Sequence, residues 1–191
     1  MSAGSGAAEN TAGAEGVRLR AALEADLPAI QAIYAEHVLH GLGSFELEPP
    51  SVAELARRMA DVRARDLPWL VAETGGQVRG YAYAARFRPR PAYRHTIEGS
   101  VYVATGQERN GIGRALLGAL VAECERQGYR QMLAVIGDSA NTASIRLHQA
   151  LGFTEAGLLR AVGFKHGSWV DVVIMQRALG PGDTTLPNHG S

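Results

Sequence analysis

The stretch from Thr96 to Cys124 constrains the fold most, because its hydrophobic pattern changes from that of a strand to that of a helix. Residues 101–103 are β-branched or aromatic, as strands prefer. Further on, apolar residues recur at the three-to-four residue spacing of one helix face. They are Leu116, Leu117, Leu120, Val121 and Cys124. The stretch therefore predicts a strand, a turn and a long amphipathic helix.

The turn between these two elements, 108–114, contains Gly111 and Gly113. Glycine lets the backbone turn tightly, and the first amides of a new helix have no acceptor within the helix. Together with the positive end of the helix dipole, such amides suit a phosphate or pyrophosphate. An ordinary strand-to-helix turn has the same glycine spacing, so the pattern alone leaves both interpretations open.

Composition excludes several classes of protein. The chain has 191 residues, enough for one domain, and its 19 basic residues balance 19 acidic ones, so nothing indicates a nucleic-acid partner. No apolar run approaches the length of a membrane span, and the N-terminus lacks the segments of a secretory signal. The one cysteine, Cys124, predicts a buried thiol. We therefore expect a soluble cytoplasmic protein with no membrane partner and no metal.

One folded domain, 17–179, is expected between two tails. Residues 1–16 are rich in Gly, Ala and Ser and predict a disordered tail, and 180–191 predicts a flexible one. Within the domain, strands and helices alternate in an order that predicts an α/β fold with a mixed sheet and helices on both faces. The predicted strands are 17–21, 69–73, 78–86, 96–103, 132–136, 153–162 and 169–179. Helices are expected to begin near Asp26, Ser51 and Asn141, and one more follows from the turn at 108–114.

Local signals predict how several elements begin and end. Asp26 is a candidate helix cap, and Ser51 with Glu54 has the spacing of a capping box. Residues 74–77 contain two glycines and predict a tight hairpin. The last two strands are expected to flank a connection at 163–168. The prolines of 88–93 cannot donate to a sheet ladder, so this segment predicts a loop before the central strand.

Three long motifs resemble one family. TIEGSVYV, AVIGDSANTASIRLHQALGF and GFKHGSWVDVVIMQ are similar to the GCN5-related N-acetyltransferases (GNAT), and most closely to the phosphinothricin and methionine sulfoximine or sulfone acetyltransferase branch. The resemblance covers the folded part and implies the GNAT fold, acetyl-CoA as cosubstrate, a small amino-acid-like amine as substrate and a homodimer. Other phosphate-binding motifs fit worse, since a Walker loop needs Gly-Lys-Ser/Thr and a dinucleotide fingerprint needs glycine where Leu116 stands.

The resemblance also implies which residues bind acetyl-CoA. The pyrophosphate loop of the family begins with Gln or Arg, whereas this chain has Glu108, which cannot help to bind phosphate. We expect binding to survive because the loop binds mostly through backbone amides. Strand amides should pair with pantetheine and hold the thioester oxygen, and a residue at the start of the fourth helix should contact the cosubstrate or cap the helix. These candidates are Val101, Tyr102, Val103, Arg109, Asn110, Gly111, Ile112, Gly113, Arg114 and Asn141.

Two residues are candidates for catalysis. Glu98 is the only acid in the central strand, and a partly buried carboxylate there could take the proton of an ammonium group. Strand alternation places Glu98, Ser100 and Tyr102 on one face, although a bulge of the kind found in the family would shift this register. His148 matches a family position at which a side chain protonates the departing thiolate, and its pKa suits acid or base work. A surface glutamate and a hydrogen-bonded core histidine are the structural alternatives.

Four residues are candidates for substrate binding. Arg88 and Arg90 lie on the proline-containing loop just before Tyr93, and a guanidinium group suits a carboxylate or phosphinate. Phe45 could form an apolar wall for the substrate or belong to the core. A small amino-acid-like amine is therefore the leading substrate, while a protein amine, or a non-catalytic acyl-CoA sensor, stays open.

Overall fold

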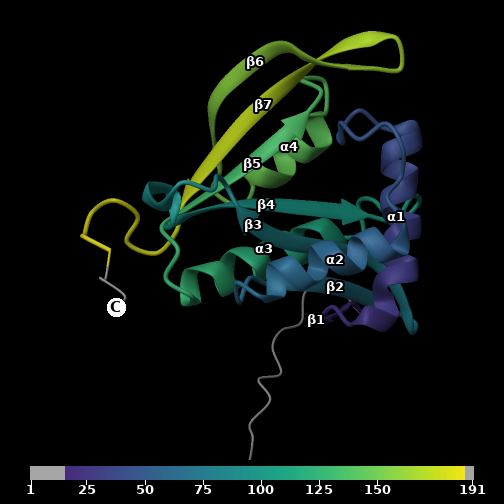
Figure 1. Ribbon diagram of the computed structural model, residues 1–191, viewed down its shortest axis with the longest axis horizontal. Coiled ribbons are helices and arrows are strands. Elements are labelled where there is room, and N and C mark those ends of the chain that lie inside the picture. Colours follow the sequence, from purple (N-terminus) through teal and green to yellow (C-terminus); the bar gives the residue numbers. More distant parts are fainter. Residues whose placement is uncertain (1–15, 188–191) are drawn as a thin grey trace, which may run out of the picture.

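The computed structural model describes residues 16–187 and folds them around one seven-stranded sheet (Figure 1). Residues 1–15 and 188–191 lie outside the described part, so almost all of the predicted tail at 1–16, and the end of the one at 180–191, lie there too. The domain limits at 17 and 179 stay a prediction.

The strands run across the sheet in the order β1-β2-β3-β4-β5-β7-β6. Only β4 and β5 pair in parallel, and the other neighbours are antiparallel, which confirms the predicted mixed sheet. The strands are β1 (Arg18–Ala21), β2 (Trp69–Thr74), β3 (Gln77–Arg86), β4 (Thr96–Val103), β5 (Gln131–Gly137), β6 (Thr154–Lys165) and β7 (Ser168–Ala178).

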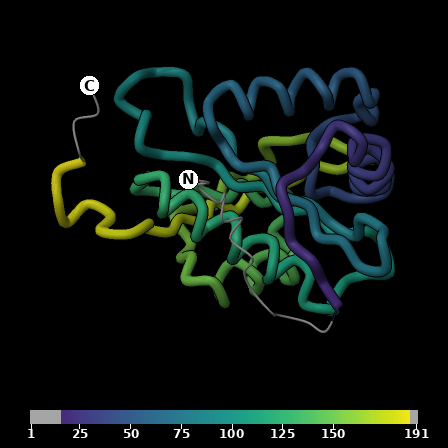
Figure 2. Tube along the Cα trace, turned by 90° about the horizontal axis from the view of Figure 1, so that it is seen from below, coloured from purple at the N-terminus to yellow at the C-terminus, as the bar shows by residue number. Residues whose placement is uncertain are grey.

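Helices cover both faces of the sheet, as predicted. Figure 2 shows α1 (Leu27–His40) and α2 (Val52–Arg63), in purple to blue, on one side and α3 (Ile112–Arg126) and α4 (Thr142–Gln149), in green, on the other. A short 3₁₀ turn, η1 (Glu24–Asp26), precedes α1. Cys124 on α3 is fully buried, and burial raises the pKa of its thiol to about 12.

Strand alternation assigns residues of β3 and β4 to these two layers. The ring of Tyr102 packs edge-on against Tyr34 of α1, with the ring centroids 5.0 Å apart. On the opposite face, a side chain at Gly80 would collide with Leu116 of α3, since an added Cβ would lie 3.0 Å from it. The odd and even positions of the central strands therefore meet different helices.

β4 and β5 separate after a short parallel contact. They pair only from Thr96 to Glu98, whereas β4 stays paired with β3 as far as Val103 and β5 stays paired with β7 as far as Gly137. Figure 1 shows β5 and β7 rising away from β4. The two strands thus enclose a wedge, and Glu98 lies at its narrow end.

Two tight turns close the hairpins of the sheet. Gly75 and Gly76 join β2 to β3, as predicted, with φ of 58° and 75°. The predicted connection at 163–168 is wrong, because β6 runs on to Lys165 and only His166 and Gly167 form the turn. Their φ values of 50° and 76° are both positive, and such turns match the twist of the flanking strands and let pairing continue to the turn itself.

The predicted helix caps are only partly confirmed. Ser51 Oγ accepts the N–H of Glu54 at 3.1 Å, which caps α2, but the Glu54 carboxylate binds Arg58 instead of completing a capping box. Asp26 makes no side-chain cap on α1. Its carboxylate instead accepts two bonds from Arg20, at 2.6 and 2.8 Å, and this ion pair lowers the pKa of the Asp26 carboxyl.

The chain continues in turns beyond β7. Arg130 donates to the carbonyl oxygens of Gly182 and Leu186 and to the hydroxyl of Thr185, so the described part of the predicted C-terminal tail is held at one point. Within residues 16–187, each helix is too short or too polar to cross a membrane.

Candidate active site

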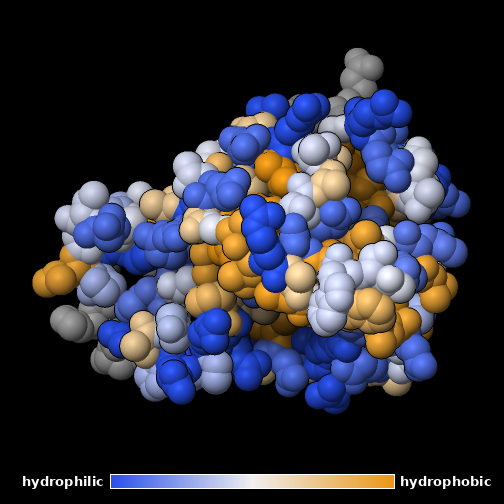
Figure 3. Space-filling model, turned by 90° about the horizontal axis from the view of Figure 1, so that it is seen from above, coloured by the Kyte–Doolittle hydropathy of each residue, from blue (hydrophilic) through white to orange (hydrophobic). Residues whose placement is uncertain are grey.

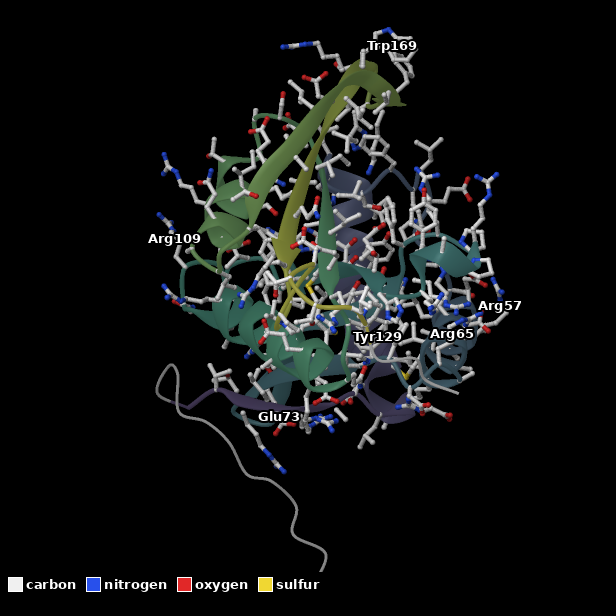
Figure 4. The ribbon with its side chains drawn as sticks, turned by 90° about the vertical axis from the view of Figure 1, so that its left-hand side faces the viewer. Arg57, Arg65, Glu73, Arg109, Tyr129 and Trp169 are labelled. Atoms are coloured by element: carbon white, nitrogen blue, oxygen red, sulfur yellow. The ribbon has the colours of Figure 1, made fainter. Side chains whose placement is uncertain are left out.

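The predicted anion-binding turn lies at the wide end of the wedge, where β4 leads into α3. The helix begins at Ile112, and Gly111 before it adopts a φ of 77°, a conformation that glycine reaches without strain. Arg109 also has a positive φ, 64°. The side chains of Glu108, Arg109 and Arg114 are exposed, and Figure 4 shows Arg109 projecting outward. The first amides of α3 therefore lie beside exposed cations, with one acid among them.

The two remaining members of this turn differ in their surroundings. Asn110 is exposed. Gly113 is at a packing contact, since an added Cβ would lie 3.3 Å from Leu147 of α4 and 3.5 Å from Val103 of β4. The glycine at 113 thus lets α3 approach both neighbours, a role that the sequence analysis did not assign to it.

Beyond Glu98, the side of β4 that faces β5 has no strand partner within the described residues. This part of β4 includes Val101, Tyr102 and Val103, whose amides were predicted to meet pantetheine. The carbonyl of Val103 accepts a hydrogen bond from His37 Nε2 of α1, at 2.8 Å. The wedge is therefore bordered by strand backbone along β4.

Asn141 caps α4, as predicted. Its Oδ1 accepts the N–H of Ser144 at 3.2 Å. A Cβ built on Gly43, in the loop between α1 and α2, would lie 3.7 Å from Asn141 Nδ2. The start of α4 and this loop therefore lie side by side next to the wedge.

Glu98 is half-buried, and burial raises the pKa of its carboxyl. Strand pairing sets it between Ala85 of β3 and Leu133 of β5. Within residues 16–187, no arginine, lysine or histidine forms an ion pair with its carboxylate. A carboxylate with these surroundings can accept a proton near neutral pH better than an exposed one.

The predicted face of Glu98 is confirmed by its pairing. The register between β3 and β4 continues without a shift from Gly80↔Val103 to Arg86↔Ile97, so no bulge interrupts this side of β4. Ser100 and Tyr102 accordingly share the face of Glu98, which is the face covered by α1 and α2.

His148 lies in the core on α4, with 3% of its surface exposed. Its Nδ1 is 2.8 Å from the carbonyl of Ser144, and a carbonyl can only accept, so Nδ1 carries the hydrogen. Burial lowers the pKa of the imidazole, and the ring packs edge-on against Phe153 with centroids 5.0 Å apart. These surroundings favour a neutral ring and agree with the alternative of a hydrogen-bonded core histidine.

A cavity of 210 Å³ lies between α1 and α2 and the face of the sheet that carries Glu98. One of its lining residues, Ala85, pairs directly with Glu98, and another, Tyr83, pairs with Ser100. The lining consists of Tyr34, Leu55, Arg58, Asp61, Val62, Trp69, Tyr81, Tyr83 and Ala85. The cavity is mostly aromatic and aliphatic, with one cation and one acid, and it can hold a small organic molecule one strand away from Glu98.

Phe45 lies in the loop between α1 and α2 and is 40% exposed. Its ring packs over two glycines, since a Cβ on Gly163 would come within 2.3 Å of the ring and one on Gly137 within 3.1 Å. Phe45 therefore contacts the end of β5 and the tip of β6, and its role as an apolar wall for the substrate stays a prediction.

Arg88, Arg90 and Tyr93 lie on the loop that joins β3 to β4, and all three are exposed. This loop contains the 3₁₀ turn η2 (Pro91–Tyr93). The guanidinium of Arg88 lies over the ring of Phe87, 5.1 Å from its centroid, and neither arginine forms an ion pair with an acid of the described residues. Since Arg86 at the end of β3 pairs with Ile97, the loop adjoins the strand position of Glu98.

Sequence reasoning missed a polar cluster next to this site. Tyr34, Ser44, Glu46, Arg58 and Lys165 are joined by hydrogen bonds that link α1, the following loop, α2 and β6. Reading His166-Gly167 as a two-residue turn would have placed Lys165 at the end of a strand, but no local signal indicates its distant partner. Among residues 16–187, no group of three or more His, Cys, Asp or Glu could hold a metal ion.

Comparison with known proteins gives one consistent result. A family model described as an acetyltransferase (GNAT) domain matches residues 19–174. The phosphinothricin N-acetyltransferase of Alcaligenes faecalis is 54% identical over 169 residues, which are 88% of this chain and 86% of that protein. The L-methionine sulfoximine/L-methionine sulfone acetyltransferase of Pseudomonas paraeruginosa is 42% identical over 167 residues, which are 85% of this chain and 95% of that protein.

A solved structure is similar to this chain and belongs to the same family as the family model and the relatives. The crystal structure of a GNAT superfamily phosphinothricin acetyltransferase from Sinorhizobium meliloti, in complex with AcCoA, matches with a TM-score of 0.89 and 48% identity over 91% of this chain and 94% of that one. The chain therefore belongs to the GNAT acetyltransferase family. Acetyl-CoA is the cosubstrate of this family, so the fold, the enzyme class and the cosubstrate predicted from the sequence are confirmed.

Proposed function

We propose that this acetyltransferase acts on a small amino-acid-like amine of the phosphinothricin, methionine sulfoximine or methionine sulfone type. The observation that carries the proposal is Glu98, a half-buried carboxylate with a raised pKa at the narrow end of the wedge and next to a small cavity. The names of the relatives at 54% and 42% identity support the same substrate class.

In the proposed mechanism, the amine approaches on the face of Glu98 and acetyl-CoA enters the wedge from the side of α3. Amides of Ile112, Gly113 and Arg114 bind the pyrophosphate, with Arg109 offsetting the charge of Glu108. Backbone groups of Val101 and Tyr102 hold pantetheine and the thioester oxygen, on which negative charge develops.

Glu98 then removes one proton from the ammonium group, directly or through water. The freed amine attacks the thioester carbon, so a C–N bond forms and the C–S bond breaks. The nitrogen loses its second proton as the tetrahedral intermediate collapses, and this proton, carried by water, neutralises the departing thiolate. His148 was predicted for that step, but its buried, neutral ring supports a structural role better, so we assign only Glu98 to proton transfer.

Arg88 and Arg90 are proposed to hold the anionic end of the substrate. Both are exposed and free of ion pairs with described acids, and both adjoin the strand position of Glu98. Tyr93 and Phe45 supply apolar surface for the stem of the substrate. A protein amine is the alternative substrate, but the cavity volume of 210 Å³ one strand away from Glu98 favours a small molecule.

A panel of acceptors tests the proposal. Release of free coenzyme A thiol would be measured with phosphinothricin, methionine sulfoximine, methionine sulfone, ordinary amino acids and short peptides. We expect the first three to give the highest kcat/KM. A higher kcat/KM for peptides would refute the substrate class, and thiol release with no acceptor in the panel would indicate an acyl-CoA-binding protein without transfer activity.

A homodimer and a cytoplasmic location also stay proposals. Four large apolar residues of the β6–β7 hairpin, Leu159, Val162, Phe164 and Trp169, are 48–69% exposed. Figure 4 shows Trp169 at the outer end of the hairpin. Figure 3 looks onto the side of the molecule on which the hairpin lies, and hydrophobic residues extend across the middle of this face. A second copy covering this surface would remove it from water. Sedimentation of the wild type and of Trp169→Ser tests the dimer.

A further inference from the structure

Lys165 has an unusual place for a lysine. It ends β6 one residue before the hairpin turn, yet only 3% of its surface is exposed. Its Nζ donates to the carbonyl oxygen of Ser44 at 2.7 Å, across 121 positions of sequence. Within residues 16–187, no carboxylate forms an ion pair with it. Burial lowers the pKa of the ammonium group, as expected when a cation leaves water.

The acceptor of this bond belongs to a tightly connected corner. Ser44 is itself buried, and its Oγ lies 2.8 Å from the hydroxyl of Tyr34. Tyr34 donates to Glu46 Oε1 at 2.9 Å, and Arg58 donates to the same oxygen at 2.7 Å. Tyr34 and Arg58 also line the cavity beside Glu98. The bond from Lys165 to Ser44 is thus one end of a chain of hydrogen bonds that reaches the cavity wall.

The loop that contains Ser44 also makes close steric contacts with β5 and β6. A side chain on Gly163 would come within 2.3 Å of the Phe45 ring, and one on Gly137 within 2.3 Å of the carbonyl oxygen of Leu42. Residues 42–45 therefore lie directly on the backbone of β5 and β6, where only glycine leaves enough room. Lys165 and Gly163 are two positions apart on β6, and they contact this loop through independent interactions.

We infer that Lys165 is a positioning residue for acetyl transfer: its buried ammonium holds the loop 42–46 in the shape that forms the acceptor side of the active site. The inference rests on the proposed function, because the loop matters only if the amine binds beside Glu98. An ammonium group with one hydrogen-bond acceptor among residues 16–187 loses hydration on burial, and the attraction of nearby Glu46 offsets this loss only in part. Lys165 is therefore better explained by its effect on the shape of the loop 42–46 than by a contribution to the stability of the fold.

Binding of acetyl-CoA should not depend on the side chain of Lys165. The pyrophosphate turn lies at the start of α3, and its conformation depends on Gly111 and on the packing of Gly113 against Val103 and Leu147. None of these residues contacts Ser44. Asn141, the acetyl-CoA candidate beside this loop, lies 3.7 Å from a Cβ built on Gly43, and its Oδ1 is held by the N–H of Ser144. Loss of the bond should consequently affect the amine substrate and leave acetyl-CoA binding almost unchanged.

Two variants and one control test the inference. Lys165→Met keeps the length of the side chain and removes its charge and hydrogen bond. Gly163→Ala keeps every polar contact and pushes a methyl group into the Phe45 ring. Arg160→Met, at an exposed position of the same strand, is the matched control for loss of a cation. Initial rates would be measured against both substrates, with the acceptor that the wild type uses best.

We expect Lys165→Met, which loses one charge-assisted bond, to raise KM for the amine by about tenfold to a hundredfold. Gly163→Ala, which displaces the Phe45 ring by steric contact, should raise the same KM, and both variants should keep KM for acetyl-CoA within about twofold of the wild type. Arg160→Met should match the wild type. Equal rises of both KM values, or no change in either, would overturn the inference. If Lys165→Met does not fold, Lys165→Gln, which also removes the charge, takes its place with the same expected and overturning results.

Hydrogen exchange separates this inference from the proposed function, because it requires no amine. In Lys165→Met, amides of 42–46 should exchange faster while those of α3 keep the wild-type rate. Unchanged exchange at 42–46 refutes the positioning role even if the enzyme acetylates the proposed amines. Failure of the wild type on every amine, with faster exchange in the variant, refutes the substrate class alone.

Discussion

Glu98 and Leu133 form the last residue pair that joins β4 to β5. Beyond this pair the two strands diverge. The carboxylate of Glu98 therefore belongs to the last residue at which β4 and β5 are still paired, and the β4 backbone after it borders the open wedge. A base at this point can reach an amine on one face of the sheet while the acyl donor enters between the strands. The position of the acid relative to the split in the sheet is therefore the centre of the proposed mechanism.

Replacing Glu98 by Gln should lower kcat by about a hundredfold to ten-thousandfold, because the amide keeps the size of the side chain but cannot accept the proton. The affinity for acetyl-CoA, measured by calorimetry, should not change. Since burial raises the pKa of Glu98 and the base acts when deprotonated, the wild-type rate should rise with pH through that pKa. The variant should lack this inflection, and a variant that retains it would exclude Glu98 as the base.

His148→Phe should leave the lower inflection of the pH–rate profile in place, because the ring is expected to be neutral throughout that range. It should instead change the pH dependence of stability. Burial lowers the pKa of His148 in the folded state, so its contribution is complete above the unfolded value of about 6.5 and is lost as the pH falls through the folded value.

Thermal unfolding between pH 7 and pH 5 checks this prediction. The melting temperature of the wild type should fall more than that of His148→Phe over this range, since the variant has no imidazole to protonate. Parallel curves would mean that His148 is not held neutral in the fold. Loss of the kinetic inflection in His148→Phe would transfer the role of base from Glu98 to the histidine.

The double variant Arg88→Gln/Arg90→Gln should raise KM for an anionic amine by about tenfold to a hundredfold, through loss of charge-assisted bonds. KM for acetyl-CoA should barely change. The matched measurement compares an amino acid with its amide, because only the carboxylate gains from the arginines. Equal kinetics of the two substrates in the wild type would show that neither arginine binds the anion.

Gly111→Val should weaken acetyl-CoA binding severely, because a β-branched residue does not tolerate the φ of 77° that starts α3. Glu108→Gln should bind as well as the wild type or slightly better, since it removes a negative charge beside the pyrophosphate. Calorimetry with acetyl-CoA measures both. Normal affinity in Gly111→Val would exclude this turn as the phosphate site, and weaker binding in Glu108→Gln would contradict the expected backbone mode.

Several features follow from the sequence because their causes are local. Period-two and period-3.6 patterns within 96–124 predict β4 and α3, since each pattern depends on residues a few positions apart. The Ser51 cap and the Gly75-Gly76 turn are predicted for the same reason. The candidates Glu98 and Gly111 could be identified because each stands out within one short segment, in a strand with no other acid and in a glycine-containing turn.

The tertiary structure decided the features that depend on distant residues. Local patterns do not indicate that β5 leaves β4 after Leu133, because the split depends on the pairing of β5 with β7. Burial of His148 against Phe153 favours a neutral ring, whereas histidine in a sequence permits either charge state. Lys165 meets Ser44 across 121 positions, and Phe45 requires glycine at 163. These contacts form only when the sheet brings separate segments together, and the site takes its shape from them.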